Sequence, residues 1–154
     1  MDTHLIGKIE LERLIVLSRE SGKGRVPHPI YNENHAGPQA LINAIQPGSY
    51  MRPHMHPNRP EIWTPVKGKI ILGIFDQNGG PVERFLLSRD ETVYTEVPEQ
   101  TYHFAFAVEP DSVFLNISQG PFNPLDSKVF PDWAPEEGSA RAAEYFERVR
   151  RMFD

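Results

Sequence analysis

Two histidines and a glutamate in the middle of the chain are the residues whose spacing points most directly to chemistry. His54 and His56 are separated by one residue, and Glu61 follows five residues later. On an extended strand alternate side chains share a face, so both imidazoles can reach one ion. Residues 57–60 are turn formers that would fold the chain back and bring Glu61 in from the neighbouring strand. Two imidazoles and a carboxylate form a facial set of metal ligands that leaves coordination positions open.

A fourth ligand is expected from a distant strand. His103 stands immediately before the apolar run FAFAV. If it faces inward, the period of two directs Ala105 and Ala107 inward as well, which leaves space above the ion, and directs Phe104 and Phe106 outward. The chain has no cysteine, so nitrogen and oxygen must hold the metal. We therefore expect one divalent ion per chain, and this ligand set accepts Zn, Fe, Mn, Ni or Co.

Further residues near these ligands are candidates for a substrate pocket or for catalysis. Tyr50 and Arg52 share strand parity with the two histidines, and Arg52 is either a surface residue or a holder of carboxylate or phosphate oxygens. Trp63 shares parity with the glutamate, and it forms an apolar pocket wall or serves only as core. Tyr102, beside the fourth histidine, is a candidate general acid, with an aromatic residue at the barrel rim as the alternative.

Short β-rich runs between turn signals must position these side chains. They recur from about residue 40 to residue 118 as ALINAIQ, EIWTPV, KIILGIF, VERFLL, TVYTEV, HFAFAV and VFLNIS. Many short strands at such spacing indicate a sandwich or a barrel and not a βαβ sheet. Residues 76–80, DQNGG, predict a hairpin loop, and residues 109–112 separate the last two strands.

The two ends of the chain are expected to carry helices. Residues 9–20 place apolar side chains at three- and four-residue spacings before Gly22, which predicts an amphipathic helix. The final helix has one apolar stripe, which we expect to pack on the barrel or on a second subunit. The expected stripes are Ile9, Leu11, Leu14, Ile15 and Leu17 in the first helix, and Ala142, Tyr145, Phe146, Val149, Met152 and Phe153 in the last.

Length and composition fit one domain over residues 1–154, with 39% apolar and 24% charged residues. The net charge of −5 and the lack of a basic cluster argue against nucleic acid as a partner. Charged residues interrupt the first twenty positions, and no apolar run approaches a membrane span, so a cytoplasmic protein is expected. The expected segments are an N-terminal helix (about 1–24), an extended arm (25–39), a β-barrel core (40–118), a Pro-rich wrap (119–137) and a C-terminal helix (138–154).

The metal-binding pattern resembles the first motif of the cupin superfamily, G-x5-H-x-H-x4-E-x6-G. Its fixed positions are matched by Gly48, His54, His56, Glu61 and Gly68. The second cupin motif, G-x5-P-x-G-x2-H-x3-N, is matched only by Pro98 and His103, with Thr92, Gln100 and Ala107 in place of its Gly, Gly and Asn. The resemblance implies a mainly β fold, a cupin-type jelly-roll barrel that binds its metal through the three histidines and the glutamate.

More narrowly, residues 25–138 resemble the WbuC family of cupin fold metalloproteins. The resembling text includes YMRPHMHP around His54, ILGIFDQNGG, VERFLLS, QGPFNP and DSKVFPDWAPEEG up to Gly138. The segment 32–35 also resembles a stretch that recurs in the family, which makes His35 a candidate catalytic residue over the barrel mouth. Members of that family occur among genes for bacterial surface polysaccharide such as O-antigen, which implies a sugar or sugar-nucleotide ligand.

Three functions are compatible with open metal positions in a barrel mouth. The first is an isomerase-like or epimerase-like enzyme in which the metal acts as a Lewis acid on a small polar molecule. The second is an Fe(II)-dependent dioxygenase-like cupin. The third is a non-catalytic module in which the metal orients a ligand, and a closed shell of four ligands would instead suit a structural zinc. Exposed strand edges and two amphipathic helices predict a homodimer.

Overall fold

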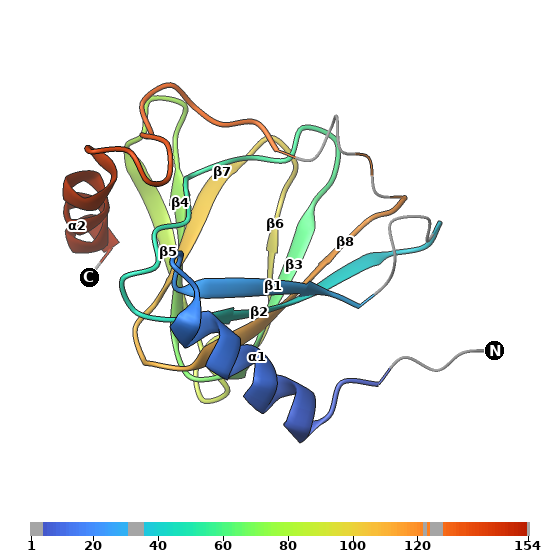
Figure 1. Cartoon of the computed structure of the whole chain (residues 1–154). Helices are drawn as coiled ribbons and strands as arrows, with labels where there is room; N and C mark the ends of the chain where they lie inside the picture. Colours follow the sequence, from blue (N-terminus) through green and yellow to red (C-terminus); the bar gives the residue numbers. More distant parts are fainter. Residues whose placement is uncertain (1–4, 31–35, 122, 124–127, 154) are drawn as a thin grey trace.

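The computed structural model describes residues 5–30, 36–121, 123 and 128–153. Two antiparallel sheets form its centre, in the orders β1-β2-β8-β3-β6 and β5-β4-β7 (Figure 1). The elements are α1 (Lys8–Glu20), β1 (Arg25–Pro29), β2 (Gln39–Ile45), β3 (Glu61–Lys67), β4 (Ile70–Phe75), β5 (Pro81–Leu87), β6 (Thr95–Val97), β7 (Tyr102–Ala107), β8 (Ser112–Ser118) and α2 (Ala142–Phe153). The mainly β jelly-roll fold with a helix at each end is therefore as predicted. Neither described helix is long and apolar enough to cross a membrane.

The core lies between the two sheets, where apolar side chains from both meet. Trp63 of β3 stacks on Phe114 of β8, with ring centroids 4.7 Å apart. The same cluster contains Leu72 of β4 and Ala105 and Ala107 of β7, all of them buried. The predicted inward direction of the two alanines is thus confirmed. The small side chains of these alanines leave room for Trp63 beside His103. The ring centroids of Trp63 and His103 are 5.8 Å apart.

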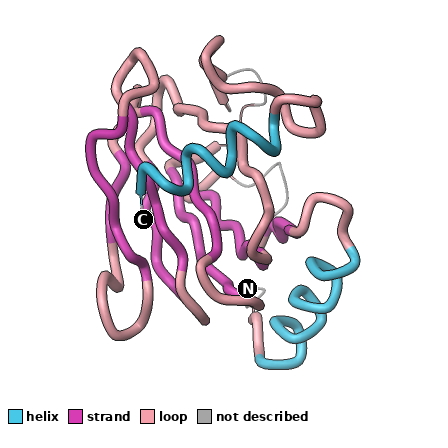
Figure 2. Tube along the Cα trace, turned by 90° about the vertical axis from the view of Figure 1, so that its left-hand side faces the viewer, coloured by secondary structure: helices cyan, strands magenta, loops and turns pink. Residues whose placement is uncertain are grey.

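Helix α2 covers the outer face of the three-stranded sheet. Figure 2, seen from the side of α2, shows the helix crossing in front of these strands. Phe104 and Phe106 of β7 point outward, as predicted, but are buried beneath Phe146, Val149 and Phe153 of the helix. The apolar stripe of α2 therefore packs on the barrel of its own chain. Met152, which was expected in this stripe, is exposed.

Helix α1 packs on the outer face of the five-stranded sheet, beside β1 and β2. Its buried side chains are Leu14 and Ile15, which contact Ile42 of β2 in one apolar cluster. The expectation for Ile9 and Leu17 was wrong, since 77% and 38% of their surfaces are exposed. The buried face is narrower than the run of apolar residues because the helix lies against a sheet edge and touches it on one side only.

The expected extended arm is in part a strand. Residues 25–29 form β1, which pairs antiparallel with β2 from Arg25 opposite Ile45 to Pro29 opposite Leu41. Two prolines are tolerated there because β1 lies at the sheet edge, where a missing N–H leaves no central ladder bond unmade. Strand β6 is shorter than its apolar run and begins at Thr95.

Two glycines of the metal-binding pattern occupy backbone conformations that favour glycine. Gly48 has φ +90° and Gly68 has φ +71°. A Cβ at Gly48 would meet no atom within 4 Å, whereas one at Gly68 would lie only 3.0 Å from the Cα of Ser112. Glycine is therefore required at position 68 both by the positive φ of the turn and by the close approach of Ser112. At position 48 it is required only by the positive φ.

Alanine substitutions separate these two requirements. Gly48→Ala should introduce only backbone strain and lower the free energy of unfolding by about 1 kcal/mol. Gly68→Ala adds the collision with Ser112, so we expect a further loss of about 1–3 kcal/mol. Urea unfolding of both variants measures the two losses. Equal losses would show that the approach of Ser112 imposes no constraint.

Candidate metal centre

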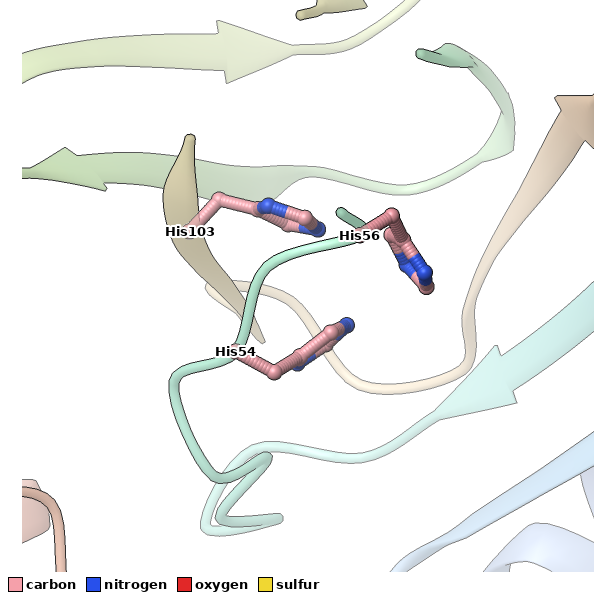
Figure 3. Close-up of side chains that lie close together, drawn as sticks. All are labelled: His54, His56 and His103. Carbon is pink, nitrogen blue, oxygen red and sulfur yellow. The ribbon is translucent and has the colours of Figure 1, made fainter. Parts of the chain in front are cut away.

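His103 comes together with His54 and His56, which are distant from it in sequence, at one end of the barrel. A short antiparallel bridge joins His54 to His103, with N–O distances of 3.0 Å and 2.9 Å in the two directions. His56 follows on the same extended segment, and the three imidazole rings gather about one space (Figure 3). Their potential ligand atoms all lie within 4.8 Å of one another, and all three residues are buried.

Backbone carbonyls fix the orientation of two of these rings. Nδ1 of His54 lies 2.9 Å from the carbonyl oxygen of Arg52, and Nδ1 of His103 lies 2.9 Å from that of Thr101. A carbonyl oxygen can only accept, so each Nδ1 carries a hydrogen and Nε2 is the nitrogen left to bind an ion. Such a contact is typical of metal-binding histidines, because it holds the ring and leaves the other nitrogen free.

Glu61, the first residue of β3, brings a carboxylate to the same space. Its Oε1 is 3.1 Å from Nε2 of His56, and its Oε2 is 3.4 Å from Nε2 of His103. Burial alone would raise the pKa of Glu61, but the adjacent imidazoles of His103 and His56 outweigh it and hold the pKa well below the usual range. The side chain is therefore ionised at neutral pH.

The donor set fits a divalent cation. Nε2 of His103 and both ring nitrogens of His56 are buried without a hydrogen-bond partner among the described residues. Nε2 of His103 lies 3.4 Å from a carboxylate oxygen of Glu61, and a cation that displaces any proton between them could bind to both atoms. Bound ligand atoms lie about 2.0–2.2 Å from such an ion, so the observed cluster needs only small side-chain adjustments to contact one.

A cavity of about 880 Å³ opens beside this cluster. His54, His56 and Glu61 form part of its wall, and Trp63, a predicted pocket residue, forms another part. The other described residues that line it are Arg25, Pro27, Pro29, Gln39, Ala40, Leu41, Asn43, Met51, Arg59, Asn116, Ser118 and Lys128. A molecule in this cavity would therefore lie against the candidate ligands.

Two predicted pocket residues, Tyr50 and Arg52, do not line this cavity. The Tyr50 hydroxyl donates to the carbonyl of Pro135 at 2.9 Å. Arg52 donates through Nε to the carbonyl of Ala134 at 3.0 Å and lies over the ring of Phe130. We predicted that both side chains point the same way as those of His54 and His56. Residues 50–53 form no regular strand, so the alternation of side-chain directions does not extend to them.

The candidate general acid Tyr102 is also outside the cavity. It precedes His103 on β7 and so points to the opposite face, where its ring centroid is 5.6 Å from that of Trp133. The alternative, an aromatic residue at the barrel rim, stays a prediction, and the Tyr102 side chain is buried in the apolar cluster that contains Phe75 and Phe146. The third candidate, His35, lies outside the described residues.

Sequence reasoning missed several polar residues of the cavity, among them Asn116 and Lys128. Asn116 had a detectable signal, because it is a polar residue on the inward face of the run VFLNIS, two positions after the buried Phe114. Lys128 had none. It lies in the Pro-rich segment, where no periodicity indicates which way a side chain points.

Comparison with solved structures identifies the fold of this chain. Oxalate oxidase bound to the substrate analogue glycolate has a TM-score of 0.55 at 19% identity, covering 71% of this chain and 56% of that one. The capsular polysaccharide assembling protein CapF from Staphylococcus aureus has a TM-score of 0.54 at 14% identity, over 69% of this chain and 32% of that one. KdgF from Halomonas sp. has a TM-score of 0.50 at 20% identity, over 65% and 81%. The protein therefore has the cupin fold.

The family is given by the sequence itself. Residues 6–87, more than half of the chain, match the model of the family described as "Domain of unknown function (DUF6016)", and the chain belongs to that family. No curated protein matches the chain. The chain spans about half the length of oxalate oxidase and about a third of CapF, so the activities of those whole proteins do not transfer to it directly.

The metal-free protein should lose stability as the pH falls below 6.5, the ordinary pKa of histidine. Burial above all, and then His103 and Lys128, hold the pKa of His54 well below that value. The unfolded chain therefore binds a proton at a pH at which the folded protein does not, and acid lowers the free energy of unfolding. Urea unfolding between about pH 7 and about pH 5 should show a shallower pH dependence for His54→Gln.

His28→Gln is the matched control. His28 lies on β1 between Pro27 and Pro29, which line the cavity, and does not line it itself. We expect this variant to keep the wild-type slope. If His54→Gln also keeps the wild-type slope, the buried neutral imidazole is not the source of the acid sensitivity.

Proposed function

We propose that this protein binds one divalent metal ion through His54, His56, Glu61 and His103 and acts on a small polar molecule held beside it. The observation that carries the proposal is the convergence of three buried imidazoles and one carboxylate beside a cavity of about 880 Å³, whose wall includes His54, His56 and Glu61. A purely structural ion is usually enclosed by its ligands. Here the ligands border a space large enough for a substrate, which favours a functional ion.

The ion would supply Lewis-acid chemistry, polarising an oxygen of the bound molecule. The chain provides the surroundings. The carbonyls of Arg52 and Thr101 orient two imidazoles, and the ionised Glu61 offsets part of the cationic charge. The apolar wall formed by Trp63 and Leu41 keeps part of the cavity free of competing polar groups.

A role in bacterial surface polysaccharide synthesis is the biological setting that we propose. Its support is the resemblance of residues 25–138 to the WbuC family. CapF, one of the proteins with a similar fold, is itself a capsular polysaccharide assembling protein. A sugar or sugar-nucleotide step is consistent with both. The cytoplasmic location and the homodimer remain predictions from the sequence.

Metal analysis tests the proposed ion. Protein purified without added metal should contain about one equivalent of a first-row transition metal, measured by mass spectrometry of the elements. His103→Gln removes a buried ligand and should weaken metal binding by more than about 100-fold, while circular dichroism shows whether the barrel is intact. His28→Gln should keep the wild-type metal content. A wild-type content in His103→Gln would contradict the assignment of this ligand.

Turnover tests the proposed action on a substrate. Metal-loaded and chelator-treated protein should be incubated with nucleotide sugars and hexose phosphates, and the products analysed by mass spectrometry. We expect product only with metal, and none with His54→Gln. Oxygen uptake with Fe(II) would instead favour the dioxygenase-like alternative. Calorimetric binding without any product would contradict an enzyme and favour a ligand-binding module.

A further inference from the structure

The floor of the cavity is built by the five-stranded sheet and carries polar groups that no protein contact explains. Asn116 of β8 stands directly opposite Trp63 of β3 in the antiparallel register. Asn43, from β2 on the other side of β8, is opposite Phe114 in the register, and its side chain reaches Asn116 diagonally. All three residues line the cavity. Glu61, the candidate metal ligand on this sheet, lies two residues before Trp63 and on the same face.

Two hydrogen-bond donors of this floor have no acceptor among the described residues. The side-chain oxygen of Asn116 accepts a hydrogen bond from Nδ2 of Asn43 at 2.9 Å. This bond leaves Nδ2 of Asn116 as the group without a partner, and Nε1 of Trp63 has none either. Asn116 is 7% exposed and Trp63 is 2% exposed. Buried donors are nearly always satisfied, so an unpaired pair on a cavity wall points to a ligand that accepts.

The charges around the cavity favour a ligand of one sign. Among the described lining residues three are cationic, Arg25, Arg59 and Lys128, and only Glu61 is anionic. Arg25 is held by Glu137 and by the carbonyl of Tyr50, so its charge is largely offset. Lys128 balances the single carboxylate, and a bound divalent cation would make the net charge around the cavity positive.

We propose that this cavity binds a small anion whose carboxylate or phosphate oxygens accept hydrogen bonds from Asn116 and Trp63. Lys128 supplies attraction between charges, and the apolar ring of Trp63 supports the remainder of the molecule. An anionic group is the choice of ligand that satisfies donors and cations together, because it accepts several hydrogen bonds and donates none. The inference rests on the proposed function and specifies its substrate class as anionic.

Isothermal titration calorimetry with defined probes tests this inference. The probes are malonate for the carboxylate, inorganic phosphate for the phosphate, and glycerol as a neutral control. Malonate or phosphate should bind at millimolar affinity or better, glycerol should not, and the tighter of the two anions identifies the source of the anionic group. Titrations use both metal-loaded and chelator-treated protein, and the metal content is measured in each sample.

Three variants assign binding to the floor. Asn116→Asp keeps an oxygen for Asn43 but replaces the free donor with a negative charge, and it should weaken anion binding at least tenfold. Trp63→Phe removes the indole N–H and keeps a ring against Phe114, so a loss of about threefold to tenfold is expected. Lys128→Met should weaken binding about tenfold and reduce its dependence on salt. Lys69→Met is the control, because Lys69 pairs with Glu109 and does not line the cavity.

The results separate this inference from the proposed function. None of the three substituted residues is a candidate metal ligand, so their variants should keep the wild-type metal content. Loss of anion binding with metal retained supports the inference. Unchanged affinity in Asn116→Asp and Lys128→Met, or binding of glycerol as tight as that of the anions, would overturn it. A protein that binds the anions but never metal would keep the inference on substrate class and refute the proposed metal chemistry.

Discussion

The alternation of side chains along β7 is the constraint on which most of this structure depends. His103, Ala105 and Ala107 point into the barrel, while Phe104 and Phe106 point out beneath α2. A shift of one residue would send the histidine into an apolar helix interface and two phenylalanines into the cavity. The same six-residue strand therefore sets the place of the candidate metal centre, the room beside it and the docking of the C-terminal helix.

Without a bound cation, the candidate metal centre lowers the free energy of unfolding of the protein. Three imidazoles and a carboxylate are buried together, and several of their nitrogens have no hydrogen-bond partner among the described residues. Buried polar groups of this kind are unfavourable unless they are paired. The apolar layers on both sides of β7 offset that cost. Local conflict within a well-packed fold is the pattern expected at a functional site.

The parts of the site that were predictable from sequence are those carried by regular spacing. The pair His54 and His56, the glutamate at the start of β3 and the inward face of β7 all follow from strand alternation and turn residues. Gln100 shows how a motif can lose a residue and keep its shape, since it has φ +58° where the second cupin motif has glycine. Tyr50 and Arg52 were misplaced because alternation was extended through a segment that is not a strand. The position of Lys128 depends on how a Pro-rich segment folds back, which no local pattern encodes.

The residues proposed for metal binding and those proposed for anion binding lie on different parts of the barrel. The candidate metal ligands come from both sheets and from the segment between β2 and β3, with His103 on β7 and Glu61 on β3. The unpaired donors belong to one sheet only, on β3 and β8, with Asn43 of β2 beside them. Substitutions on β2 and β8 can therefore change what the floor recognises without displacing any candidate ligand. In the proposed scheme, this separation would let one barrel with a constant metal centre bind different small molecules through changes on the five-stranded sheet.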